Sequence, residues 1–331
     1  MAQEFVNQHY QLTKNTKVKN FIMQNSSINH ELSRNNELNN LFYSDCDDAE
    51  MTAVLNKTAK NSNSSITVCS FKYEISVNQD NCNDIYINAG KITAYDRRVY
   101  NAICTLYSHG KIQMSLYEIY SIVTGYGKKK PSNKQLQNIL SSINKMRAID
   151  LFIDLTEEIK TNGIKNMDIL YKHNVVKENN SGIKYCVIQD HMLNAAIGHA
   201  MTNAGTKVHT IILLTQPALF TYNQAKGSLL NIPTQYIAIK DINITEKTIA
   251  FQDYFLMRII GYKNKAMHEN KIMYKTLYKE IGEEKPRLSK DFIRDRELIN
   301  KLFTGWLEEG LIKSYGEIKE SRSYIGITFE I

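Results

Sequence analysis

Positive charge and small polar side chains are concentrated in one stretch of this 331-residue chain. No acidic residue occurs between Glu118 and Asp150. Lysine side chains neutralise the phosphates of nucleic acids, and amides and hydroxyls on a helix surface form hydrogen bonds with base-pair edges. The alternative is an ordinary solvated helix surface, which usually mixes both signs of charge. The candidate DNA-binding residues of this stretch are Lys128, Lys129, Lys130, Asn133, Lys134, Gln137, Ser141, Asn144 and Lys145.

A helix is needed to present these side chains on one face. Ser132, with Gln135 three residues later, has the pattern of a helix N-terminus with a capping box. The apolar residues that follow have the spacing of a helix with one buried side. They are Leu136, Ile139, Leu140, Ile143 and Met146. The sequence therefore predicts a helix after Ser132 whose polar side chains point away from the core.

Two further helices precede this one, and β-strands follow it. The first helix begins near Thr93 and Asp96 and ends at Gly110. The second begins at Ser115, which forms a capping-box pattern with Glu118, and it ends at Gly125. After the third helix the apolar residues alternate with a period of two, which predicts antiparallel strands. The predicted strands lie within 149–159, 166–176 and 182–190.

The same order of elements recurs near the C-terminus. The predicted helices there are 245–262, 271–282 and 289–310, and a hairpin follows over 311–331 with its loop at 316–323. Between the second and third helices, both copies contain Gly-x-x-Lys-Pro, at 127–131 and 282–286. Gly favours the end of a helix, and Pro keeps the preceding residue extended. The order predicts a weak internal duplication of a unit of three helices and a hairpin.

Three helices followed by a hairpin predict the winged variant of the helix-turn-helix. In that motif the third helix enters the major groove and the hairpin, or wing, contacts the backbone or the minor groove. The second copy carries charges of both signs, so ion pairs that support only the helix are the alternative there. For the wing the alternative is ordinary solvated loop charge. The candidates in this copy are Arg287, Lys290, Arg294 and Lys301 around the third helix, and Arg322 in the wing.

The predicted fold class is α+β, with two tandem winged-helix domains behind a partly flexible polar extension. The extension covers residues 1–63, the first domain with its leading strands covers 64–215, and the second covers 216–331. Removal of residues 1–60 is expected to leave the fold intact. The net charge of +7 divides into −3 for residues 1–90 and +10 for the remainder. A basic body favours a polyanion partner, DNA or RNA.

The sequence argues against several classes of function. The eight histidines include no His-x-His pair, and the five cysteines include no Cys-x-x-Cys pair. The phosphate loop of ATPases and the Gly-x-Ser-x-Gly of serine hydrolases are also absent. We therefore expect no enzyme activity, no catalytic residue, no cofactor and no metal. No apolar run reaches the ~18 residues of a membrane span, and no signal peptide is seen, so a cytoplasmic location without a membrane partner is expected.

One region resembles a known family. The segments "ITAYDRRVYNAICTLY", "MSLYEIYSIVTG", "SNKQLQNILSSINKM" and "IDLFIDLTEE", between Lys91 and Glu158, are similar to the first domain of plasmid-type replication initiators, the iteron-binding proteins with two winged helices. The C-terminal unit resembles them by element order only. The resemblance implies an initiator without nuclease activity that binds origin repeats in double-stranded DNA, helps melt adjacent AT-rich DNA and recruits host replication proteins. Such initiators often switch between a homodimer and a monomer. In that family the C-terminal unit is usually the principal reader, whereas here the more uniformly basic helix is in the first unit.

The predicted function is sequence-specific binding of double-stranded DNA, as a replication initiator of a plasmid, phage or other mobile element. The alternative is a transcriptional regulator of a mobile element that uses the same domains on an operator. Two unequal units in one chain favour directly repeated sites over a palindrome, because a dimeric repressor needs only one reading domain per chain. A protein-interaction role for the winged helices is a third alternative, against which the acid-free stretch from Ile119 to Ile149 argues.

Overall fold

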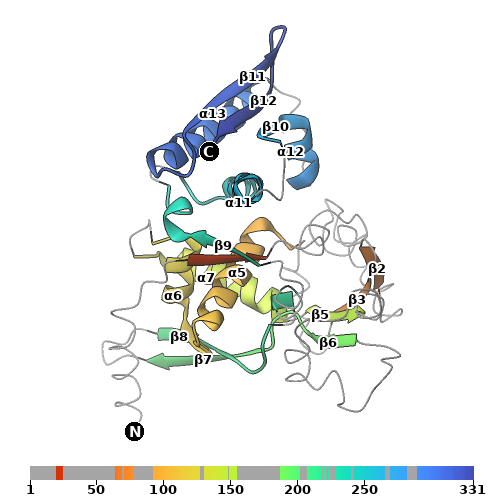
Figure 1. Cartoon of the computed structure of the whole chain (residues 1–331). Helices are drawn as coiled ribbons and strands as arrows, with labels where there is room; N and C mark the ends of the chain where they lie inside the picture. The colour runs from red at the N-terminus through yellow and green to blue at the C-terminus, as the bar shows by residue number, and fades with distance from the viewer. Residues whose placement is uncertain are drawn as a thin grey trace.

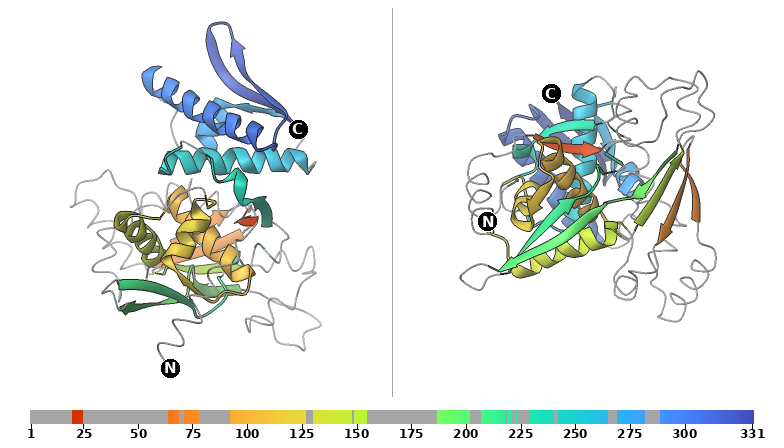
Figure 2. Two further views of the ribbon diagram at one scale, coloured as in Figure 1. Left: turned by 90° about the vertical axis from the view of Figure 1, so that its left-hand side faces the viewer. Right: turned by 90° about the horizontal axis from the view of Figure 1, so that it is seen from below.

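The protein is a mixed α/β structure of helices and small sheets (Figure 1). Figures 1 and 2 show two stacked groups of elements, with the C-terminal group above the first. The computed structural model describes residues 20–24, 64–68, 71–77, 92–126, 130–147, 149–154, 187–201, 207–217, 219–220, 223, 229–239, 242–264, 269–281 and 289–331.

The first group is built on three helices, α5 (Ala94–Ser108), α6 (Leu116–Val123) and α7 (Asn133–Arg147). The capping box at Ser115 is formed as predicted, and Thr93 forms a second one with Asp96 at the predicted start of α5. The predicted capping of α7 is confirmed as well, since the N–H of Gln135 donates to Ser132 Oγ and the N–H of Ser132 donates to Gln135 Oε1. Helices α5 and α6 end close to the predicted glycines. Gly110 and Gly125 adopt φ of 81° and 58°, a conformation that is favourable for glycine because it has no Cβ. The three helices were therefore predictable from caps and periodicity.

The second group contains α11 (Glu246–Lys263), α12 (Tyr274–Ile281) and α13 (Ser289–Glu308). Its strands are β10 (Lys271–Met273), β11 (Ser314–Glu320) and β12 (Ser323–Glu330). The prediction of a helix from residue 271 is wrong at its start, because residues 271–273 form strand β10 and α12 begins at Tyr274. A strand of 3 residues is too short to show an alternation of apolar and polar residues in the sequence. The prediction of a loop over 316–323 is also wrong, since only Ser321 and Arg322 join β11 to β12, and Ser321 takes a φ of 54°.

A three-stranded sheet accompanies each group of helices, and the two sheets have the same strand order. In the second group the order is β10-β12-β11. In the first it is β4-β8-β7, with β4 at Gln113–Ser115, β7 at Ala195–Met201 and β8 at Lys207–Leu213. In both groups a strand of 3 residues leads directly into a helix of 8 residues, β4 into α6 and β10 into α12. The hairpin β7–β8 therefore corresponds to the hairpin β11–β12.

The sequence analysis placed the hairpin of the first unit in the strands after residue 149, whereas the strand order matches β7–β8 to β11–β12. Strand β5 (Ile149–Asp154) belongs to another sheet, of order β2-β3-β5-β6. The other strands of that sheet are β2 (Ser64–Val68), β3 (Phe71–Val77) and β6 (Val187–His191). The predicted strand at 166–176 lies outside the described residues. The predicted antiparallel pairing of the strands after residue 149 is confirmed for β5 and β6. Alternation in sequence shows that a segment is a strand but not which sheet it joins, and the place of the wing stays a prediction.

A short N-terminal strand is part of the core. Strand β1 (Asn20–Gln24) pairs antiparallel with β9 (Leu229–Pro233), which precedes the 3-10 helix η2 (Thr234–Tyr236), and both strands lie where the two groups meet (Figures 1 and 2). The side chain of Phe21 is 0% exposed, and the N–H of Ile22 donates to Thr105 Oγ1 at 2.8 Å. The expectation that residues 1–60 can be removed without effect on the fold is therefore wrong for this segment. The rest of 1–63 lies outside the described residues.

One contiguous hydrophobic cluster joins the two groups. It extends in sequence from Phe21 to Phe329 and contains inward-facing residues of each of the six α-helices in the part of the chain that the structure describes. Within it, Phe255 of α11 contacts the rings of Phe303 and Trp306 of α13 edge to face, with centroids 5.0 and 6.4 Å apart. The division of the chain at residue 215 stays a prediction.

Candidate nucleic-acid interface

The third helix of the first group presents an exposed polar face. Among the predicted residues, Asn133, Lys134, Gln137 and Ser141 are exposed on α7, and Lys130 is exposed just before it. Ile139, Ile143 and Met146 are fully buried on the opposite side. Asn138 is also exposed and was missed by the sequence analysis, although it is one residue from Gln137 and shares its amide chemistry. Lys128 and Lys129 lie outside the described residues.

Two predicted residues at the C-terminal end of α7 are held within the protein. Lys145 Nζ is 2.7 Å from Asp96 Oδ2, and the lysine side chain is only 13% exposed. Asp96 is also the capping carboxylate of α5, so this ion pair connects α7 to the start of α5. Asn144 is half-buried and accepts a hydrogen bond from Arg147 at 3.4 Å. The structure therefore gives Lys145 a role in packing, where the sequence predicted contact with phosphate.

The third helix of the second group also exposes one face, and charges of both signs lie on it. Lys290, Arg294 and Lys301 are exposed as predicted, and Arg287 lies outside the described residues. Arg294 lies 3.4 Å from Asp291, but the two side chains are 74% and 41% exposed, so the pair contributes little. The exposed residues of this helix that were not predicted include Ile293, Glu297 and Thr304.

One acidic residue of α13 points into the core and leaves the surface more basic than the sequence suggests. Asp295 is buried, accepts a hydrogen bond from Tyr278 Oη at 2.6 Å and lies 2.8 Å from Lys247 Nζ. Its charge is therefore compensated by α11 and α12. The predicted alternative, in which the acidic residues only support their own helix, does not apply to Asp295.

The hairpin β11–β12 of the second group is fixed to α13 by paired hydrogen bonds from one arginine. Arg296 donates from Nε and from a terminal nitrogen to the two oxygens of Glu317 on β11, at 2.7 and 2.6 Å. Tyr274 Oη donates to the same carboxylate at 3.0 Å. These hydrogen bonds, those from Arg296 above all, hold the pKa of Glu317 below its usual range. The pKa of the Arg296 guanidinium is raised, chiefly by its hydrogen bonds with Glu317.

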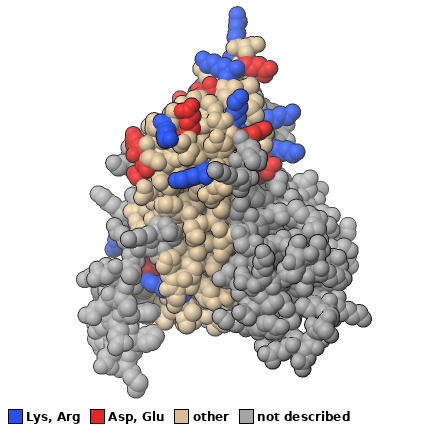
Figure 3. Space-filling view, in the orientation of Figure 1, with Lys and Arg blue, Asp and Glu red and all other residues tan. Residues whose placement is uncertain are grey.

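An aromatic ring on β12 extends this connection toward the end of the hairpin. The guanidinium carbon of Arg296 lies 3.2 Å from the centroid of the Tyr324 ring, and Lys319 Nζ lies 4.6 Å from it. Cations over an aromatic face are attracted by the ring quadrupole. Arg322 is exposed in the two-residue turn that follows β11. In Figure 3 basic and acidic side chains are intermixed over this group, and the far end of the hairpin is basic.

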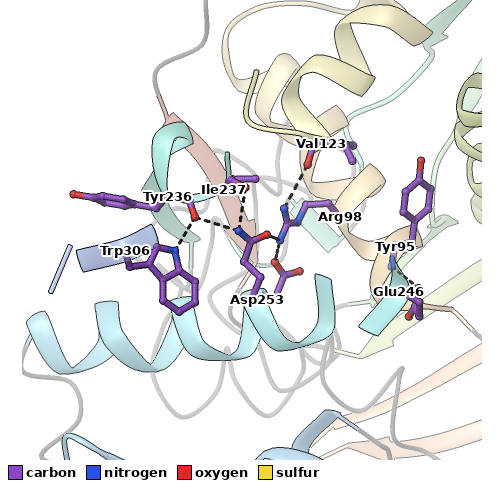
Figure 4. Close-up of polar contacts among 9 residues, drawn as sticks. Tyr95, Arg98, Val123, Tyr236, Ile237, Glu246, Asp253 and Trp306 are labelled. Carbon is purple, nitrogen blue, oxygen red and sulfur yellow. Dashed lines mark hydrogen bonds and ion pairs between the residues drawn. The ribbon is translucent and has the colours of Figure 1, made fainter. Parts of the chain in front are cut away.

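A buried polar cluster joins the two groups (Figure 4). The guanidinium of Arg98 on α5 forms an ion pair with Asp253 on α11 and donates to Gln252 Oε1 at 3.0 Å. Gln252 Nε2 donates to the carbonyls of Tyr236 and Ile237, at 3.2 and 3.0 Å.

A second set of contacts supports the same junction. Trp306 Nε1 donates to the carbonyl of Tyr236 at 2.8 Å. At the N-terminus of α5, the carboxylate of Glu246 accepts hydrogen bonds from the N–H groups of Ala94 and Tyr95. These contacts connect α5 and α11 directly and connect both groups through the short segment before α11.

Among the described residues, no helix has the length and apolar character to cross a membrane, and no three side chains of His, Cys, Asp or Glu gather as a metal site.

No protein-family model and no curated protein matches this sequence. Two crystal structures of domains 2 and 3 of RctB are similar to it. One is 14% identical, with a TM-score of 0.41, over 81% of this chain and 89% of that chain. The other is 12% identical, with a TM-score of 0.40, over 81% and 91%. The inferences about DNA therefore come from the elements and side chains of this chain itself.

Proposed function

We propose that this chain is a sequence-specific double-stranded DNA-binding protein that reads its site with two winged-helix units. The single observation that carries the proposal is the repeated arrangement of elements. Each group has a short strand, an 8-residue helix, a longer third helix and a hairpin, and its strands have the same order. In both groups the third helix buries one side and exposes residues of the types that bind phosphates or base edges in other proteins.

The two third helices have different roles in this proposal. The face of α7 carries Lys134 with the uncharged Gln137, Asn138 and Ser141, which suits hydrogen bonding to base edges. The face of α13 carries cations beside Glu297, and its wing is fixed by Arg296. The two units therefore read different sub-sites.

The junction between the units supports binding to one asymmetric site. Buried contacts between α5 and α11 hold the units together, so both meet the same duplex in a fixed relation. A chain with two unequal readers favours direct repeats over a palindrome. Together with the resemblance to plasmid-type initiators, this leads us to propose a replication initiator of a mobile element. Recruitment of host replication proteins and a homodimeric state belong to the same proposal, as does the absence of catalytic activity.

The test is selection of binding sites followed by footprinting. The full-length chain is used to select duplexes from a random library, and the selected sequence is then located by footprinting on the DNA element that encodes the chain. Protection of tandem repeats beside AT-rich DNA is the expected result, and protection of a promoter palindrome would instead indicate a transcriptional regulator. If no sequence is enriched, or if binding is insensitive to salt between about 50 and 200 mM, where phosphate contacts weaken steeply, the DNA-binding proposal fails.

A further inference from the structure

We propose that Ile293 of α13 is a specificity-determining residue that contacts the C5-methyl group of a thymine in the major groove. This inference rests on the proposed DNA-binding function, and it adds one base to the site that the second unit reads. The observation behind it is an exposed isoleucine in the middle of a charged helix face.

Ile293 is 48% exposed although it is a large apolar residue. It lies on the outer face of α13, where exposed residues recur at intervals of three or four. Lys290 is one turn before it, and Arg294 is the next residue. Both cations are exposed, so a polyanion bound to this face comes within contact distance of the isoleucine.

The location of Ile293 along the helix fits contact with a base. It is the fifth residue of α13, and the N-terminal residues of a recognition helix are the ones that contact base edges. Glu297, one turn later on the same face, is also exposed. A carboxylate is repelled by phosphates but accepts a hydrogen bond from a cytosine amino group. The middle of this face therefore suits base edges better than the sugar-phosphate backbone.

The apolar side chain of Ile293 determines which base it can recognise. It has no hydrogen-bonding group, and thymine is the base whose major-groove edge presents a methyl group. Burial of apolar surface against that methyl stabilises the complex with thymine, and cytosine in the same position offers no apolar partner. Ile293 therefore favours a T·A pair at the position it faces.

The experiment removes the methyl group and the side chain separately. In the duplex selected by the full-length chain, each thymine is replaced in turn by deoxyuridine, which lacks only the C5-methyl group. At one position the wild-type chain should bind about fourfold more weakly, as expected for one buried methyl group. Ile293→Ala should bind the thymine duplex more weakly by about the same factor or more, and should not distinguish the two duplexes at that position.

Leu307→Ala is the matched control, because Leu307 is exposed (39%) on the same helix about four turns further on. This variant should keep the wild-type sensitivity to deoxyuridine. If no deoxyuridine substitution weakens wild-type binding, or if Ile293→Ala remains as sensitive as wild type at every position, the inference is overturned while the DNA-binding proposal stands. Failure to select any duplex would overturn the DNA-binding proposal itself.

Discussion

Arg98 and Asp253 form an ion pair that is buried between α5 and α11, and the guanidinium of Arg98 also lies over the ring of Phe21. The distance from Arg98 Cζ to the centroid of that ring is 5.5 Å. Three segments that are far apart in the sequence therefore meet at one side chain. Substitution of Arg98, Asp253 or Phe21 should therefore weaken the packing between the two proposed DNA-binding units.

Asp253→Asn should lower the free energy of unfolding by about 3–5 kcal/mol, because it leaves the guanidinium of Arg98 buried without a counter-charge. Urea unfolding followed by circular dichroism measures the change. Asp291→Asn is the matched control. It breaks the exposed pair between Asp291 and Arg294, and the expected change is below about 1 kcal/mol. Equal changes in the two variants would show that the Arg98–Asp253 pair is not desolvated.

Phe21→Ala should destabilise the protein by about 3–5 kcal/mol, the range for loss of a buried aromatic side chain. Phe21 is completely buried, and its ring is in contact with Arg98, so the substitution leaves a cavity at the junction. Ile112→Ala is the control, because Ile112 is 58% exposed and its removal should change stability by less than about 0.5 kcal/mol. An unchanged unfolding midpoint for Phe21→Ala would mean that β1 contributes nothing to the core.

The helices of this fold could be predicted because their signals are local. Caps such as Ser115 with Glu118, together with repeated apolar residues, determine where α5, α6 and α7 begin and which side is buried. The strand partners could not be predicted. Strand β1 has only three consecutive apolar residues and pairs with β9 more than 200 positions away, and β4 and β10 are too short to show a period.

The candidate site shows the same limit. The exposed face of α7 follows from helix periodicity, so Lys134, Gln137 and Ser141 were placed correctly on the surface. Lys145 was not, because its partner Asp96 is 49 positions earlier in the chain and comes close only through the packing of α7 on α5. A run of basic residues in a sequence therefore identifies a candidate DNA-binding face of a helix. Ion pairs formed in the folded protein then determine which of these residues stay exposed on that face.

Glu317→Gln should change how stability depends on pH. The folded-state pKa of Glu317 is lowered, first by the hydrogen bonds of Arg296, so its contribution is complete above the unfolded-state pKa of about 4.3 and is lost as the pH falls through the folded-state value. At pH 7 the variant should be less stable by about 1.5 kcal/mol, the lower end of the range for hydrogen bonds to charged groups. Below about pH 4.3 the difference from wild type should shrink.

The measurement is the urea midpoint of wild type and variants at intervals between pH 7 and pH 2.5. Glu320→Gln removes an exposed carboxylate from the end of the same strand and should keep the wild-type profile. If the plots of urea midpoint against pH for Glu317→Gln and wild type stay parallel down to the lowest pH, the carboxylate of Glu317 does not carry the connection between α13 and the hairpin β11–β12.

Lys134→Ala and Gln137→Ala should affect DNA binding in different ways, although both residues are exposed on the same face of α7. Removal of the lysine should weaken binding to selected and random duplexes alike and lower the slope of log K against log salt by about 1. Removal of the glutamine amide should weaken binding to the selected duplex by about 1–3 kcal/mol and leave random DNA almost unchanged, because only hydrogen bonds to base edges carry sequence information. Fluorescence anisotropy with both duplexes at several salt concentrations separates the two effects. Equal losses on both duplexes for Gln137→Ala would show that α7 contacts only the backbone.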